Sequence, residues 1–177
     1  MLILCLDFIN SLWYEDKDLS KDPLSSVSQA VAFCQKWAIS EEPVPVGQLD
    51  FLISARLFLN EVTNELCQNK TISQKNLDRL NQYLHALIYC ESVQKNPDEL
   101  LVFREFENPE MCALAYAVFS SFTQLIKVAS LERLKKCENN DCGWFFYDES
   151  KSHTRKWCSN RCASLIKVRR FRSALNH

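Results

Sequence analysis

The sequence predicts a mainly helical α+β protein with one small β-hairpin and a short metal-stabilised module at the carboxyl end. Three observations support this class. Apolar residues recur at helical spacing in several stretches, one segment has strand–turn–strand character, and four cysteines form two close pairs near the end of the chain. With 177 residues, 47% of them hydrophobic, the chain can build a packed core. We therefore expect a helical body over residues 1–130 and a small module over residues 131–177.

Three stretches of the body have the periodicity of amphipathic helices. Residues 26–37 begin at the capping residue Ser26, and residues 48–68 form a longer candidate. A third stretch follows the polar residues 71–73 and carries regularly spaced leucines. The short connection predicts that the second and third helices lie antiparallel.

The pattern changes between residues 88 and 107. Residues 88–93 and 100–103 have strand composition, and the turn-forming run 95–98 separates them, which predicts a β-hairpin. Pro109 then predicts the start of another helix, because proline suits a first helical position. Residues 111–128 are apolar on nearly all sides, which is typical of a central buried helix.

Composition excludes several classes of function. The chain has only two glycines, so it cannot build a glycine-rich phosphate-binding loop. Its three histidines form no HExxH pair, and the signature of zinc deaminases is also absent. We therefore expect no enzymatic activity. The opening residues lack the basic region of a signal peptide, and no apolar run could span a membrane, so we expect a cytoplasmic protein.

Charge is divided unevenly along the chain. Residues 1–130 hold 10 basic and 17 acidic side chains, whereas residues 131–177 hold 11 basic and 5 acidic ones. The net charges are therefore −7 and +6. This asymmetry predicts an acidic body that carries a basic module facing a polyanion.

Four cysteines in the basic module have the spacing of zinc ligands. They are Cys137, Cys142, Cys158 and Cys162. Two cysteine pairs in so short a segment are typical of one tetrahedral structural zinc, which also supplies the folding free energy that a small core lacks. His153 could replace one cysteine in an alternative ligand set. The five isolated cysteines are interpreted as small core residues: Cys5, Cys34, Cys67, Cys90 and Cys112.

The arrangement around these cysteines predicts a treble-clef zinc finger. Gly143 permits a tight turn after the second cysteine, residues 144–147 have strand character, and residues 155–157 could return as the second strand of a hairpin. Ser159 can cap the final helix.

The final helix combines apolar and basic residues. Its apolar residues fall on one arc, by which we expect it to dock: Leu165, Val168, Phe171 and Leu175. Seven basic residues in and before the helix are candidate nucleic-acid contacts: Arg155, Lys156, Arg161, Lys167, Arg169, Arg170 and Arg172. The alternative is that the basic face is only solvated.

The module contains a series of residues at fixed spacing: CENNDCGWFFYD from Cys137 to Asp148, Ser150, RKWCS from Arg155, Cys162 and KVRRF from Lys167. Together these residues resemble the CGNR zinc finger. The opening LDFINS from Leu6 similarly resembles the start of the ABATE domain, which precedes that finger in a bacterial family of stress-induced transcription regulators. The chain departs from the family after Cys162, where Ala-Ser-Leu replaces Gly-Asn-Arg.

This resemblance implies a function for each part of the chain. The finger would hold one structural zinc ion and contact duplex DNA, and the body would sense a small-molecule effector or mediate assembly. A homodimer is also expected, because many DNA-binding regulators read paired half-sites. The resemblance places the effector near Asp7, Asn10 and Trp13. Binding of RNA or of another protein remains the alternative, because treble-clef fingers also serve those roles.

Overall fold

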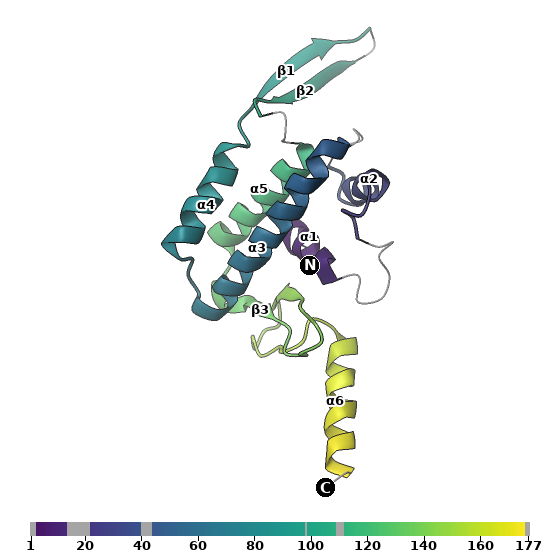
Figure 1. Ribbon diagram of the computed structural model, residues 1–177, viewed down its shortest axis with the longest axis vertical. Helices are drawn as coiled ribbons and strands as arrows, with labels where there is room; N and C mark the ends of the chain where they lie inside the picture. Colours follow the sequence, from purple (N-terminus) through teal and green to yellow (C-terminus); the bar gives the residue numbers. More distant parts are fainter. Residues whose placement is uncertain (1–2, 14–21, 40–43, 98, 109–111, 176–177) are drawn as a thin grey trace.

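The structure, a computed structural model, describes residues 3–13, 22–39, 44–97, 99–108 and 112–175 (Figure 1). Its elements are α1 (Leu4–Asn10), a 3-10 turn (Ser11–Trp13), α2 (Val27–Lys36), a 3-10 turn (Val46–Gln48), α3 (Leu49–Asn69), α4 (Gln74–His85), β1 (Tyr89–Lys95), β2 (Leu100–Phe106), α5 (Ala113–Val128), a 3-10 turn (Leu131–Arg133), β3 (Leu134–Lys136), β4 (Phe145–Tyr147) and α6 (Asn160–Leu175). The predicted α+β class is confirmed. No helix in the described ranges is long and apolar enough to cross a membrane.

The helices of the body lie close to the predicted ranges. The Ser26 hydroxyl accepts a hydrogen bond from the backbone N–H of Gln29 and so caps α2. Helix α3 ends at Asn69, and the next residue, Lys70, caps it in a left-handed conformation. Helix α4 then runs back beside α3 (Figure 1), as the short connection predicted.

Helix α5 is central, as predicted, but it begins later. Its N-cap is Cys112, which is extended, so the helix cannot run from Pro109 through that residue. Residues 109–111 lie outside the described part of the chain. Helix α5 packs against α1, and its Phe119 stacks on Tyr83 of α4, which in turn stacks on Phe58 of α3. The three helices thus share one aromatic core.

The β-hairpin forms as predicted and projects from one end of the body (Figure 1). Strands β1 and β2 pair antiparallel from Tyr89 opposite Phe106 to Lys95 opposite Leu100. The base of the hairpin is tied down by Tyr89, whose ring contacts Tyr116 of α5 at 4.9 Å between centroids. Cys90 is exposed, contrary to the prediction that the isolated cysteines are core residues.

The finger differs from the prediction in its strand pairing. Strand β4 pairs with β3, the segment before the first cysteine, and not with residues 155–157, which form no strand. Strand β3 has only three residues, too few for a periodic sequence signal. The segment after the turn still lies beside the residues that follow β3, because the Lys156 carbonyl accepts a hydrogen bond from the Glu138 N–H.

The finger and the body share a hydrophobic core. Leu134 of β3 and Phe145 of β4 are fully buried in the same cluster as the body helices. Helix α6 instead projects away from the rest of the molecule (Figure 1). Its predicted docking through the apolar arc is therefore wrong for the described part of this chain.

Candidate zinc site and the surfaces around it

The four predicted zinc ligands converge from three parts of the finger. Cys137 directly follows β3, Cys142 lies in the turn before β4, and Cys158 and Cys162 flank the start of α6. All four sulfur atoms lie within 4.8 Å of one another. The Cys142–Cys158 and Cys158–Cys162 sulfur separations are both 3.7 Å.

These separations fit one tetrahedral zinc ion. A Zn–S bond of about 2.3 Å implies sulfur–sulfur distances of about 3.8 Å in a regular tetrahedron. Four thiolates also complete the coordination of zinc, which makes the site structural. His153, the alternative ligand, lies outside the group of metal-binding side chains.

Neighbouring N–H groups surround the sulfur atoms. The buried Asn139 side-chain amide donates to the Cys162 sulfur at 3.6 Å, and the Cys158 backbone N–H donates to the Cys137 sulfur at 3.5 Å. Such donors orient metal ligands and stabilise thiolates. Sequence reasoning did not assign a role to Asn139, because its position within the motif does not reveal which sulfur its side chain meets.

The thiols differ in their acidity before metal binds. Burial raises the pKa of Cys142 to about 11, and burial with the neighbouring Cys142 and Cys137 sulfurs raises the pKa of Cys158. Burial opposes ionisation of Cys162 too, but hydrogen bonds, led by that from Asn139, lower its pKa below the usual value. Zinc binding must therefore release protons from the buried thiols.

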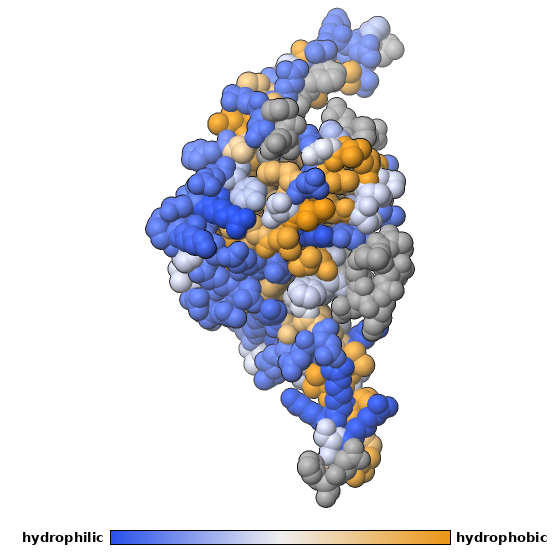
Figure 2. Space-filling view, viewed as in Figure 1, coloured by the Kyte–Doolittle hydropathy of each residue, from blue (hydrophilic) through white to orange (hydrophobic). Residues whose placement is uncertain are grey.

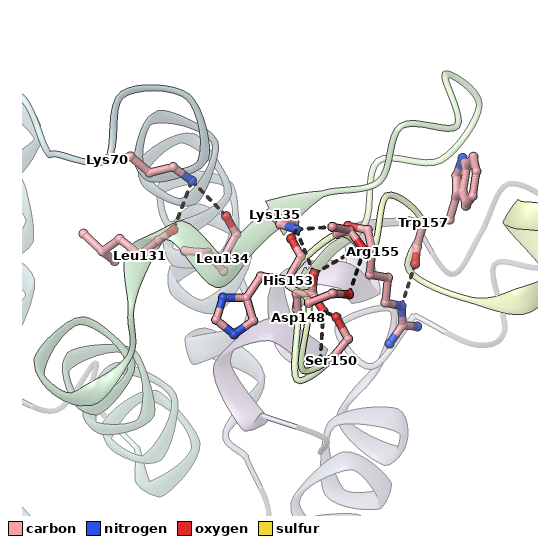
Figure 3. A network of polar contacts seen from close by, with 11 residues as sticks. Lys70, Leu131, Leu134, Lys135, Asp148, Ser150, His153, Arg155 and Trp157 are labelled. Atoms are coloured by element: carbon pink, nitrogen blue, oxygen red, sulfur yellow. Dashed lines mark hydrogen bonds and ion pairs between the residues drawn. The ribbon is translucent and has the colours of Figure 1, made fainter.

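Asp148 organises the loop between β4 and α6. Its carboxylate is fully buried and accepts hydrogen bonds from Lys135 Nζ at 2.7 Å, from the Ser150 hydroxyl at 2.6 Å and from the Arg155 N–H at 2.9 Å (Figure 3). Burial alone would raise the pKa of Asp148, but these donors outweigh it and hold the pKa well below its usual range. The same Lys135 ammonium also donates to the carbonyls of His153 and Arg155.

The body holds the finger through Asn10. The buried Asn10 amide donates to the Phe145 carbonyl and accepts from the Phe145 N–H, both at 2.8 Å. Asp7, also buried, accepts from Lys36 Nζ at 2.7 Å and from the Trp37 indole N–H at 2.9 Å. These two polar side chains thus have partners within the protein. Ligand binding near Asp7, Asn10 and Trp13 stays a prediction.

Trp13 packs on the turn of the finger at Gly143. A Cβ atom added to Gly143 would overlap the Trp13 indole ring, so the turn requires glycine because of this contact. The reason differs from the predicted one, since the described glycines have no positive φ.

Replacing Gly143 by alanine should therefore displace the indole. We expect the free energy of unfolding to fall by about 1–3 kcal/mol, the usual cost of overpacking. Gly47 is the matched control, because a Cβ there meets no atom within 4 Å. Gly47→Ala should change stability by less than about 0.5 kcal/mol. Denaturant titration of the zinc-loaded proteins measures both, and equal effects of the two substitutions would contradict the packing argument.

Three of the predicted nucleic-acid contacts are used within the finger. The Arg155 guanidinium donates to the carbonyls of Trp157 and Cys158, and Arg169 pairs with Asp141 and donates to Asn139. Lys156 lies 3.3 Å from Glu138. The other four are exposed on α6 and have no ion pair among the described residues: Arg161, Lys167, Arg170 and Arg172.

A hollow of about 700 Å³ lies where the end of α3 meets the finger. Lys70 and Lys136 contribute to its walls, together with the zinc ligand Cys137. The Lys70 ammonium donates to the carbonyls of Leu131 and Leu134, so it also joins the body to the finger (Figure 3). Sequence reasoning missed both lysines, because the hollow forms only when segments distant in the sequence pack together.

The fold and the site together define a zinc-finger protein, in which a helical body carries a four-cysteine structural zinc module. Residues 133–174 match the model of the CGNR zinc finger family. This range includes all four cysteines and most of α6. No curated protein matches the chain.

Proposed function

We propose that the protein binds nucleic acid through its zinc finger and acts as a DNA-binding transcription regulator. The observation that carries the proposal is the surface of α6, which projects from the body, has no acidic residue and exposes five basic side chains, four of them without an ion pair among the described residues. Such a helix can bring cations to phosphates, which supply most of the affinity for nucleic acid. Because a site of four thiolates leaves no open position on zinc, we propose a binding function and no catalysis by the metal.

The body has a second role in this proposal. We assign residues 1–130 to an ABATE-like domain and residues 131–177 to the finger, with the body sensing an effector or mediating assembly. The Asn10 contacts with Phe145 and the Trp13 contact with Gly143 support coupling between the two parts, since both join α1 and its following turn directly to the finger.

Binding to duplex DNA of mixed sequence should depend steeply on salt. The logarithm of the affinity should fall linearly with the logarithm of salt concentration, by about 0.9 for each phosphate neutralised. The double variant Lys167→Gln/Arg170→Gln should make this slope less steep by about twice 0.9, because two phosphate contacts are lost. Fluorescence anisotropy of labelled DNA with the zinc-loaded protein measures both values.

The matched control is Lys75→Gln/Lys127→Gln, which removes two exposed charges from the body. It should leave the slope unchanged. Binding that does not weaken with salt, or equal losses in both double variants, would reject the proposed α6 contact. A preference for single-stranded RNA over duplex DNA would identify the alternative, RNA-binding function.

A further inference from the structure

Asn139 presents its side-chain amide to a zinc ligand in a fixed orientation. The residue is 3% exposed, and its Nδ2 group donates to the Cys162 sulfur at 3.6 Å. At the other end of the amide, Oδ1 accepts hydrogen bonds from the Asp141 backbone N–H at 3.4 Å and from Arg169 Nη1 at 3.2 Å. An amide has one donor end and one acceptor end, so the two donors at Oδ1 leave Nδ2 to face the sulfur.

This orientation matters because the two ends of the amide have opposite effects on a thiolate. An N–H group directed at the sulfur stabilises its negative charge, whereas a rotated amide would direct the partial negative charge of Oδ1 at it. Zinc binds the thiolate form of cysteine, so the first arrangement favours zinc binding and the second opposes it. A contact that fixes the amide therefore acts on the metal site without touching a ligand.

Arg169 is placed for this contact by its position on α6. It follows Cys162 by seven residues, about two helical turns, so the two side chains lie on nearly the same side of the helix. Its Nη1 group donates to Asn139, and its Nη2 group pairs with the Asp141 carboxylate. The planar guanidinium can bind both acceptors at once because its N–H groups have a fixed arrangement.

These contacts connect α6 to the metal site. Cys162 is the only buried residue of α6 in the described part of the chain. The helix projects from the molecule (Figure 1), and both hydrophilic and hydrophobic residues of its surface face solvent at the lower end of Figure 2. Arg169 joins the middle of this helix to residues 139–141, which lie between the first two zinc ligands.

We propose that Arg169 is a positioning residue of the zinc site, which holds the Asn139 amide with its N–H directed at the Cys162 sulfur and so strengthens zinc binding. This role separates Arg169 from the four basic residues of α6 that have no ion pair among the described residues. The charge of Arg169 is matched by that of Asp141, so the other four remain the candidate phosphate contacts.

The first test is the zinc affinity of the full chain without nucleic acid, measured by competition with a chromophoric chelator. Arg169→Gln should weaken zinc binding by about two- to tenfold, the effect of one net hydrogen bond. Asn139→Leu should weaken it by at least about tenfold, which is typical of losing a hydrogen-bond partner of a metal ligand. Because no nucleic acid is present, the result is independent of the proposed DNA binding.

Arg170→Gln is the matched control for Arg169→Gln. It removes the same charge from the next residue of the same helix, and Arg170 is exposed and has no ion pair among the described residues. Zinc affinity should be unchanged by this substitution. Equal zinc affinities of the Arg169→Gln and Arg170→Gln proteins would overturn the proposal.

A double-mutant cycle tests whether Arg169 acts through Asn139. In the Asn139→Leu protein the amide is absent, so adding Arg169→Gln should cause no further loss of zinc affinity. The same loss in the wild-type and Asn139→Leu backgrounds would show that Arg169 acts independently of the amide, and would reject the proposed role.

Cobalt substitution adds a readout that a general loss of stability would not change. Co²⁺ should occupy the same four-thiolate site, and its sulfur-to-cobalt charge-transfer absorption should move to longer wavelength when a sulfur loses a hydrogen bond. The shift should be largest for Asn139→Leu, smaller for Arg169→Gln and absent for Arg170→Gln. A cobalt-loaded Arg169→Gln protein with the wild-type spectrum would contradict the proposal. Metal content and helical circular dichroism verify that each variant is folded.

Discussion

Replacing Cys142 by serine is expected to abolish zinc binding and to unfold the finger. The module is too small to be stable from its own core, and zinc supplies about 10–16 kcal/mol of apparent binding free energy in comparable modules. The bound metal should fall from one ion per chain to none. Helix α6 should melt, because Cys162 is its only buried residue among those described. Removing zinc from the wild-type protein with a chelator should have the same effect.

The effect should extend into the body. Leu134 and Phe145 belong to the shared core, and Asn10 forms both of its hydrogen bonds to Phe145. We therefore expect the body to remain helical but to unfold at a lower temperature. Elemental analysis and thermal circular dichroism measure the two effects. Cys90→Ser is the control, because Cys90 is exposed and belongs to β1, which lies at the other end of the molecule from the finger (Figure 1). A Cys142→Ser protein that retains one zinc ion would contradict the ligand assignment.

Replacing Asp148 by asparagine should destabilise the finger by about 3–5 kcal/mol, the usual cost of breaking a buried ion pair. The substitution leaves Lys135 without its partner carboxylate and turns an amide N–H₂ toward existing donors. Glu132→Gln removes an exposed carboxylate from the same module and should change stability by less than about 0.5 kcal/mol. Denaturant titration of the zinc-loaded proteins provides the measurement.

The stabilisation of the folded protein by the Asp148 carboxylate should decrease as pH falls. Because the pKa is lower in the folded than in the unfolded protein, the carboxylate contributes its full stabilisation above the unfolded pKa of about 3.9. That contribution is lost as pH falls toward the folded pKa. The stability difference between wild type and Asp148→Asn should therefore be constant near neutral pH and shrink in acid, as long as zinc remains bound. A difference that grows in acid would contradict the assigned pKa direction.

The parts of the fold that sequence predicted well are those with local signals. The periodicity of residues 48–68 predicted α3 to within one residue at each end, and turn residues between two strand-like runs predicted the hairpin. Cysteine spacing predicted the zinc ligands, because four thiolates in a short segment have few other arrangements. By contrast, helix α1 was not predicted. Six of its seven residues are buried, so its sequence lacks an amphipathic pattern.

The sequence by itself determined the chemistry of the finger and the uneven charge of the chain, since both are properties of residue identity and spacing. Only the tertiary structure decided which surfaces are used. In the structure, Arg155 and Arg169 form hydrogen bonds within the finger, and the Trp13 ring leaves room only for glycine at position 143. The four residues of the apolar arc of α6 are exposed. These outcomes depend on contacts between segments far apart in the chain, such as the pairing of Asn10 with Phe145, and local sequence patterns do not encode which distant segments meet.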